Sequence, residues 1–393
     1  MAGEIRAADA IAAVKLETTS GVDAFASTPP DPATDFLNGS ITMNLSPEQI
    51  QNPEQTGSRD RAPPILGALG GDFTLTCLLR GSGAPATPAK WMRLLRIASW
   101  NERLQATALG APTAAEGGTA TSATLPAAIF NLGADAYQGM PILIGGAGVS
   151  FPITGIIGNT SARVASLGHT YSPALTTTNT VQVPPHALYK PHSDEALDRT
   201  ATVYVYQGGL RHKFTGVAGG WSLRMPTGQP GQMTFQLSGQ YQGSDAAATP
   251  AGIVLDKVSP PIFRDGICRL NRKLCRVSNL TINSGVTFDQ PPNPEAPQGR
   301  DPSLVGDRLV TADLDPLATV QETLDVLAAL KGGEAQTFVA ATDDSAPAGN
   351  RFMFVIPAVS YTGFSQQNVG RLLGNRIPVA AYGQNQGCFI AQF

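Results

Sequence analysis

One short stretch of this chain contains a cluster of residues that could bind a charged partner. This basic cluster consists of Arg264, Arg269, Arg272, Lys273 and Arg276. Cations at such a density can bind the phosphates of DNA or the acidic surface of a partner protein. A solvated linker or a salt-bridged patch between subunits is favoured instead, because the loops contain Asp and Glu residues that can pair with them.

Side chains with catalytic or metal-binding potential form no recognisable motif. The histidines are scattered, and for His186 and His192 we expect surface-loop positions instead of a metal site. The four cysteines lack a CxxC pair, so we expect reduced thiols, mostly in cores. Asp315 precedes Pro316 and is expected to cap a helix. The sequence therefore predicts no enzyme, no metal and no cofactor.

A pattern near residue 40 returns near residue 280 and indicates a duplication. Ser40–Leu45 matches Asn279–Ser284 as an apolar-Thr-apolar-Asn strand, and a Pro-rich loop with an Arg-Asp pair follows each copy. The pairs are Arg59-Asp60 and Arg300-Asp301. A second strand opened by Gly-Asp is then expected from Gly71 and from Gly306. A doubled β-unit without catalytic residues favours a self-assembling structural protein.

Composition also favours a β-rich, assembled protein. Only 15% of the 393 residues are charged, and 42 Gly with 31 Pro make up roughly 19% of the chain, against about 12% ordinarily. The net charge of −3 argues against a dedicated nucleic-acid binder. The apolar stretch Met140–Ile157 is interrupted by prolines and glycines, so we expect buried strands there and no membrane role.

The expected elements give a mainly β (α+β) fold with two β-sandwich or barrel units and one packed helix in each. A helix or turn at Ala7–Val14 comes first, and Phe73, Leu75, Cys77 and Leu79 share one face of a strand. Helices are expected at 88–98 and 316–330, the second with Val320, Leu324, Leu327 and Ala328 on its apolar face. Further strands are expected at 202–206, 210–215, 232–238, 308–314, 337–341, 351–356 and 377–381.

Two units of unequal length follow from these elements. Residues 1–250 form the first unit, with an Ala/Gly/Thr/Pro-rich insertion at about 107–198, and residues 251–393 form the second. The run from Ser244 to Gly252 is expected to link them. Edge strands are expected to pair between chains, because long strand edges need to be covered.

These patterns resemble the major tail tube proteins of long-tailed, non-contractile bacteriophages. The resemblance rests on Lys15–Thr19 with Gly21 and Asp23, the doubled strand-loop-strand unit, the hairpin at 202–216 and the ending 349–361. It implies subunits that form stacked rings around a channel for the genome. It further implies that loops Ser46–Gly70 and Gln290–Gly306, with Arg59, Asp60, Arg300 and Asp301, reach the neighbouring ring.

The resemblance also implies a set of partners and a location. The partners are other copies of the chain, the tape-measure, tail terminator and distal tail proteins, and double-stranded DNA in non-specific passage. The location is the virion tail, assembled in the host cytoplasm. Since family tubes have six units per ring, a doubled chain predicts a homotrimer with pseudo-sixfold symmetry, with six whole chains as the alternative.

Two other classes of protein stay open. A decoration protein or adhesin of the virion surface could bind a receptor or glycan through the 107–198 insertion, and would then expose clustered aromatic residues there. A hydrolase on a β-scaffold would need a catalytic constellation that the sequence does not contain. The duplication favours the ring-forming protein over both.

Overall fold

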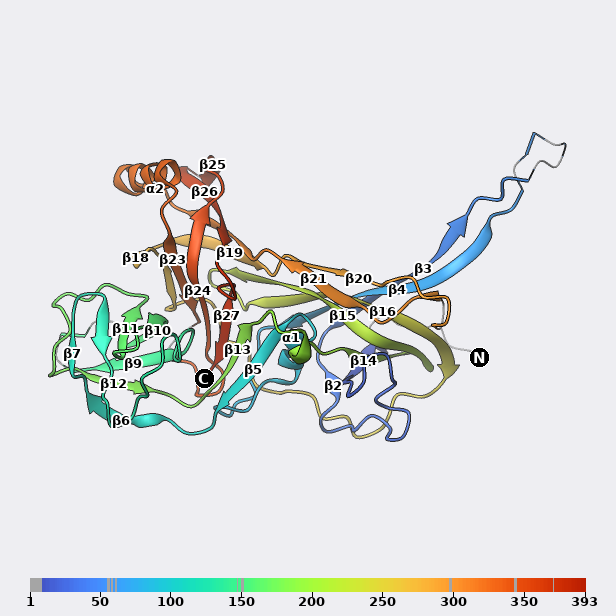
Figure 1. Ribbon diagram of the computed structural model, residues 1–393, viewed down its shortest axis with the longest axis horizontal. Helices are drawn as coiled ribbons and strands as arrows, with labels where there is room; N and C mark the ends of the chain where they lie inside the picture. Colours follow the sequence, from blue (N-terminus) through green and yellow to red (C-terminus); the bar gives the residue numbers. More distant parts are fainter. Residues whose placement is uncertain are drawn as a thin grey trace.

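The chain is built mainly from antiparallel β-strands, which confirms the mainly β fold (Figure 1). The computed structural model describes residues 9–393 except 55, 56, 58, 61, 147, 150, 151, 297, 298, 343, 344 and 370. Their strands form a sheet of 18 strands, a sheet of seven and a sheet of two.

Two sets of elements, each comprising strands of the large sheet and one helix, have the same order along the chain. The first repeat comprises β1 (Ile11–Leu16), β3 (Ser40–Ile50), β4 (Ile65–Leu78), α1 (Arg93–Arg96), β14 (Ala201–Gln207), β15 (Leu210–Pro226) and β16 (Gln232–Ala246). The second repeat comprises β17 (Ile267–Leu270), β19 (Val277–Asn283), β22 (Thr311–Pro316), α2 (Val320–Gly332), β23 (Gln336–Ala341), β24 (Phe352–Tyr361) and β26 (Leu372–Ala381).

The strand order within the sheet is the same in both repeats. It runs β1-β14-β15-β16-β4-β3 in the first and β17-β23-β24-β26-β22-β19 in the second. Along the chain, α1 lies between β4 and β14 of the first repeat, and α2 lies between the equivalent strands β22 and β23 of the second. The repeats therefore share one topology, which supports the duplication inferred from the short sequence match. The boundary at 250/251 stays a prediction.

The repeats are joined edge to edge. Residues Ser222–Pro226, at the end of β15, pair antiparallel with Asn279–Asn283 of β19. A shared hydrophobic core continues beneath the junction and includes Trp221, Leu280 and Ile282. The strand pairing and the common core make the two repeats one body.

The remaining strands extend this framework. A row formed by β5 (Trp100–Gln105), β13 (His186–Pro191) and β27 (Phe389–Gln392) attaches to β24. The short strands β2 (Phe36–Leu37), β18 (Lys273–Leu274) and β25 (Ser365–Val369) pair with β1, β17 and β26. The two-stranded sheet consists of β20 (Val286–Asp289) and β21 (Leu304–Arg308). Two 3₁₀ turns occur at Lys90–Met92 and Glu195–Leu197.

Most of the region predicted as an insertion forms the seven-stranded sheet, in the order β6-β12-β9-β10-β11-β8-β7, whereas its last strand, β13, belongs to the large sheet. The strands of the seven-stranded sheet are β6 (Leu109–Ala114), β7 (Gly117–Gly118), β8 (Ser122–Thr124), β9 (Pro141–Gly145), β10 (Ile153–Asn159), β11 (Val164–Leu167) and β12 (Thr180–Val183). Its core includes Val339, Met353 and Val355 of β23 and β24. The inserted sheet therefore packs on the second repeat, although the chain enters it from the first (Figure 1).

The expected strand faces are confirmed where a sheet buries them. Phe73, Leu75, Cys77 and Leu79 are all at most 4% exposed, and the alternating residues Phe352, Phe354 and Ile356 are fully buried. The hairpin of β14 and β15 turns at Gly208 and Gly209, which both have positive φ angles. Such a two-residue turn suits the twist of paired antiparallel strands, and glycine adopts it without steric cost.

The predicted bounds of both helices are wrong, and so is the expected helix at the start of the chain. Residues 11–16 form β1 instead, because pairing with β14 and β2 buries Ala12, Ala13 and Val14. The helix expected at 88–98 is reduced to α1 and the preceding 3₁₀ turn. The second helix begins only at Val320, since Thr319 accepts a hydrogen bond from the Glu322 amide and caps it.

The predicted apolar face of this second helix is also wrong. In α2 only Val326 is buried, whereas Val320, Leu324 and Leu327 are 81%, 56% and 41% exposed. The prediction assumed that the richest apolar stripe would face the sheet. Asp315 does not cap α2: its carboxylate accepts hydrogen bonds from the amides of Ser278 and Asn279.

Candidate functional site: the two β-hairpins

The second and third strands of each repeat form a long hairpin, and the two hairpins match in register. Ile41 pairs with Leu75 and Met43 with Phe73 in the first. Leu280 pairs with Leu314 and Ile282 with Ala312 in the second. The predicted match of the strands at residues 41–44 and 280–283 is therefore confirmed.

The predicted match of the Gly-Asp pairs is wrong. Gly306 and Asp307 lie in β21, whereas the counterpart of the strand at 71–76 is β22, which begins at Thr311. The second hairpin bends at Gly285, where φ is 56° and an added Cβ would lie 1.9 Å from the Leu309 carbonyl oxygen. This bend splits each strand of the second hairpin in two, so a comparison of sequence alone paired the wrong segments.

The second hairpin lies on the first repeat. Ser284 and Trp221 exchange two hydrogen bonds of 2.9 Å, one of them through the Ser284 hydroxyl. The Ser303 amide donates to the Gly216 carbonyl, and the Ser303 hydroxyl donates to the Ser238 carbonyl. Pro302 packs so closely that a Cβ on Gly216 would lie 2.6 Å from its ring. This hairpin is thus held by its own chain.

The first hairpin extends away from the body (Figure 1). Its apolar residues Ile50, Ile65 and Leu66 are 49%, 53% and 67% exposed. Between these strands, Arg59 and Asp60 are exposed at the end of the hairpin. Much of the loop expected at 46–70 is strand, because β3 continues to Ile50 and β4 begins at Ile65.

The structure separates the two predicted Arg-Asp pairs. Arg300 Nη2 lies 3.5 Å from Glu48 Oε2, so it connects the second hairpin with the first. Asp301 accepts a hydrogen bond of 2.7 Å from Asn293 within its own loop. Their inter-ring role stays a prediction.

The basic cluster is divided among several neighbours. Arg272 donates two hydrogen bonds of 2.8 Å to Leu167 and Ser166 of the insertion. Lys273 forms an ion pair with Asp325 of α2, and Arg269 is 8% exposed. Arg264 and Arg276 are exposed. Arg272 and Lys273 are therefore engaged within the chain, whereas a salt-bridged patch between subunits and a contact with DNA both stay predictions.

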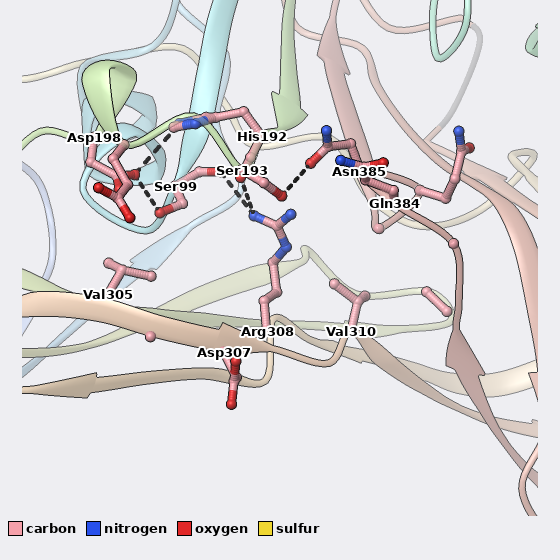
Figure 2. A pocket seen from close by; sticks show the side chains of 16 residues that line it. Ser99, His192, Ser193, Asp198, Val305, Asp307, Arg308, Val310, Gln384 and Asn385 are labelled. Carbon is pink, nitrogen blue, oxygen red and sulfur yellow. Dashed lines mark hydrogen bonds and ion pairs between the residues drawn. The ribbon is translucent and has the colours of Figure 1, made fainter.

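A cleft of about 360 Å³ lies between the two repeats and is built around Arg308 (Figure 2). Arg308 donates to the carbonyls of Ser99 and His192 and lies over the Trp100 ring, 5.1 Å from its centroid. Burial lowers the pKa of the Arg308 guanidinium. Arg308 is the last residue of β21. Its hydrogen bonds to Ser99 and His192 therefore fix the second hairpin to the first repeat.

This cleft contains a serine, a histidine and an aspartate, but the hydrogen bonds between them are not those of a catalytic triad. The Ser99 hydroxyl donates to Asp198 at 2.7 Å, and His192 Nε2 lies 3.8 Å from the same carboxylate. A catalytic triad needs the serine hydrogen-bonded to the histidine, which the acid then orients. Burial lowers the pKa of His192. The expectation that His186 and His192 lie in surface loops is wrong, because both are buried.

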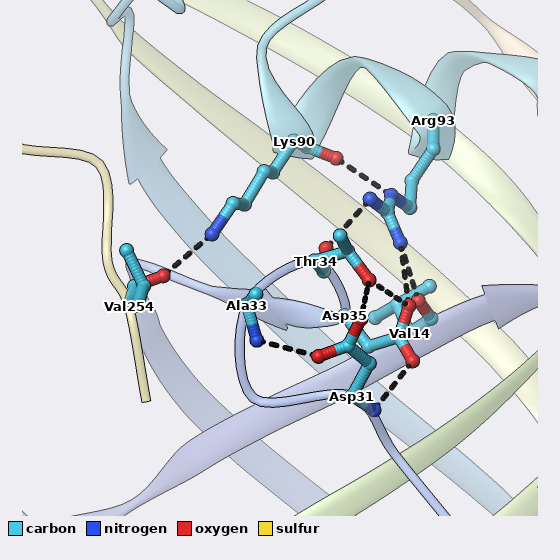
Figure 3. A network of polar contacts seen from close by, with 8 residues as sticks. All are labelled: Val14, Asp31, Ala33, Thr34, Asp35, Lys90, Arg93 and Val254. Atoms are coloured by element: carbon cyan, nitrogen blue, oxygen red, sulfur yellow. Dashed lines mark hydrogen bonds and ion pairs between the residues drawn. The ribbon is translucent and has the colours of Figure 1, made fainter. Parts of the chain in front are cut away.

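A polar network surrounds α1 and the 3₁₀ turn before it. Arg93 of α1 donates to the carbonyls of Val14 and Thr34 and lies 3.5 Å from Asp35, and Lys90 donates to Val254 (Figure 3). These contacts tie the helix to segments far away in the sequence.

Glu17 is a buried acid to which the sequence reasoning gave no role. Glu17 is 4% exposed and accepts hydrogen bonds from the Gly21 and Gly216 amides and from the Thr200 and Thr202 hydroxyls. The sequence feature that could have indicated a role for Glu17 is its charge within the Lys15–Thr19 motif. Glu17 thereby positions Gly216, on which the second hairpin rests.

The described part of the chain offers no other obvious chemistry. No three His, Cys, Asp or Glu residues in it are grouped to hold a metal ion. All four cysteines are free and buried, as expected. None of its helices is long and apolar enough to cross a membrane.

The fold is a duplicated, edge-joined antiparallel sheet with an extended hairpin, an architecture suited to a structural subunit. A family described as phage tail tube protein matches residues 7–370, so the chain belongs to that family. The resemblance seen in the sequence is thereby confirmed, and the family is one of structural tail proteins that assemble into a tube. No curated protein matches the chain.

Proposed function

We propose that this chain polymerises into stacked rings that form the tail tube, the conduit through which the phage genome passes into the host. The observation that carries the proposal is the repeated strand order in a chain of the tail tube family. Each ring contains three chains and therefore six repeats. The edge-to-edge junction between the two repeats of one chain is the contact that recurs between neighbouring chains around the ring.

The tape-measure, tail terminator and distal tail proteins are the proposed further partners, with assembly in the host cytoplasm. Double-stranded DNA passes without specific binding, which the net charge of −3 supports, since a strongly cationic wall would hold phosphates. The first hairpin, with Arg59 and Asp60 near its end, is the proposed contact to the next ring.

The adhesin alternative gains no support from the insertion. Phe130, Tyr137, Tyr171 and Tyr189 are all at most 5% exposed. Phe151 lies outside the described residues. These four rings belong to protein cores and do not offer a surface for stacking on a sugar.

Electron microscopy of the purified protein at high concentration tests the proposal. We expect hollow tubes whose unsymmetrised ring average contains three chains. Six chains in each ring would keep the tube and overturn the trimer. Compact monomers without a channel at all concentrations would overturn the function itself.

A further inference from the structure

The two repeats of the chain contact each other through one pair of strands. Each strand of this pair has an equivalent in the other repeat, and these equivalent strands do not make such a contact within the chain. The side offered by the first repeat is the end of β15, and the side offered by the second repeat is β19. In the common topology, β3 is the counterpart of β19. The counterpart of the end of β15 is β25, which continues the line of β24 and pairs with the start of β26.

Both counterparts have an unoccupied edge. Within the described residues, β3 pairs only with β4, and β25 pairs only with β26. Unpaired strand edges present rows of amide and carbonyl groups that readily accept another strand. They lie far apart in the molecule, with β25 at the top beside α2 and β3 leading into the extended hairpin at the right (Figure 1).

Burial differs in the way that a missing neighbour would produce. Leu280 and Ile282 of β19 are completely buried, whereas their counterparts Ile41 and Met43 of β3 are only half-buried. The core of the first repeat ends at this edge without a cover, while the same edge of the second repeat is covered by β15.

An exposed apolar patch lies beside β25. Leu372 and Leu373 of β26 are 60% and 45% exposed, and Val320, Leu324 and Leu327 of α2 are exposed as well. The Ala318 amide donates to the Leu373 carbonyl, and Asn375 donates to Thr323, so helix and strand form one surface. Apolar surface of this kind, next to a free strand edge, marks a protein contact.

We propose that β25 of one chain pairs antiparallel with Ser40–Asn44 of β3 in a second copy, which repeats the β15–β19 contact between chains. The inference rests on the proposed tube and specifies the contact within its rings. The register follows from β15 and β19: Arg224 pairs with Thr281, and their counterparts are Gln367 and Thr42. The contact is head-to-tail, so each chain uses a different end toward each neighbour.

Paired cysteine substitutions test this register. Thr42→Cys and Gln367→Cys are made in separate chains, and the two variants are mixed, assembled and oxidised. We expect a disulfide-linked dimer from the mixture and none from either variant alone. The native cysteines are all buried, so they add little background. The double variant in one chain should give covalent species that end at three chains.

The matched control combines Thr42→Cys with Arg224→Cys. Arg224 occupies the position equivalent to Gln367, but β19 of its own chain already fills that edge. We expect no cross-link between these two positions. Tubes in the microscope without the Thr42–Gln367 cross-link would overturn the pairing and leave the function intact. Cross-linking of one variant with itself would likewise overturn the head-to-tail contact, and absence of any polymer would overturn the proposed function together with it.

Discussion

The two hairpins have the same origin in the topology but differ in their surroundings. The second bends at Gly285 and rests on the first repeat through Ser284, Ser303 and Pro302. In the first, β3 continues as one strand from Ser40 to Ile50, and the hairpin carries exposed apolar residues. The difference teaches that the chain satisfies one of two equivalent contacts internally and leaves the other for a neighbour.

The strongest test of this comparison uses equivalent positions of the two hairpins. Ile282→Ala should lower the free energy of unfolding by about 3 kcal/mol, because it leaves a cavity in a fully buried site. Met43→Ala should cost the unassembled chain about 1 kcal/mol or less, since Met43 is only half-buried. Urea unfolding below the assembly concentration measures both. Equal losses would show that the two edges are not differently covered.

The next largest effect concerns the surface beneath the second hairpin. Glu17→Ala removes the acceptor of four hydrogen bonds, and we expect a loss of about 3 kcal/mol or somewhat less. Glu17→Gln keeps one carbonyl acceptor and should lose less. Hydrogen exchange at Ser303 should rise in step with this loss, because its amide bonds to Gly216. Unchanged hydrogen exchange at Ser303 would show that Glu17 does not stabilise the position of the second hairpin.

Arg308 should have an intermediate effect on the stability of the chain. Arg308→Ala removes two hydrogen bonds and the contact with Trp100, and we expect a loss of about 2 kcal/mol. Arg308→Lys keeps the charge but not the planar group, so it should recover only part of the stability. Thermal unfolding of the unassembled chain measures this. A full recovery by lysine would show that charge alone holds this end of β21.

The smallest effect is expected between the hairpins themselves. Arg300 and Glu48 are 3.5 Å apart with side chains that are 35% and 55% exposed. Exposed ion pairs contribute little, so a double-mutant cycle with Arg300→Ala and Glu48→Ala should give a coupling of about 0.5 kcal/mol or less. The coupling should disappear in high salt. A coupling above about 1.5 kcal/mol would mean that the first hairpin is already fixed within the chain.

Local sequence patterns predicted the strands whose alternation the sheet uses directly. The faces of 73–79 and 352–356 and the hairpin at Gly208-Gly209 follow from side-chain period and turn chemistry, which act over a few residues. The short match between Ile41–Asn44 and Leu280–Asn283 likewise reflects equal positions in a shared register. These features need no knowledge of distant contacts.

The tertiary structure decided what each surface faces. The α2 stripe is apolar in sequence but exposed, because no segment of the same chain lies over it within the described residues. The insertion packs on the second repeat through Val339 and Met353, which no local pattern could indicate. Glu17 accepts a hydrogen bond from Gly216, 199 residues away in the chain, and Arg308 donates one to Ser99, 209 residues away.

The sequence by itself thus determined the mainly β character, the duplication signal and the family, because composition, period and short motifs are local properties. Only the tertiary structure decided which edge is covered by its own chain and which is left open. The physical reason is that burial and strand pairing depend on segments brought together by folding, and the bend at Gly285 decides where one of the two hairpins lies.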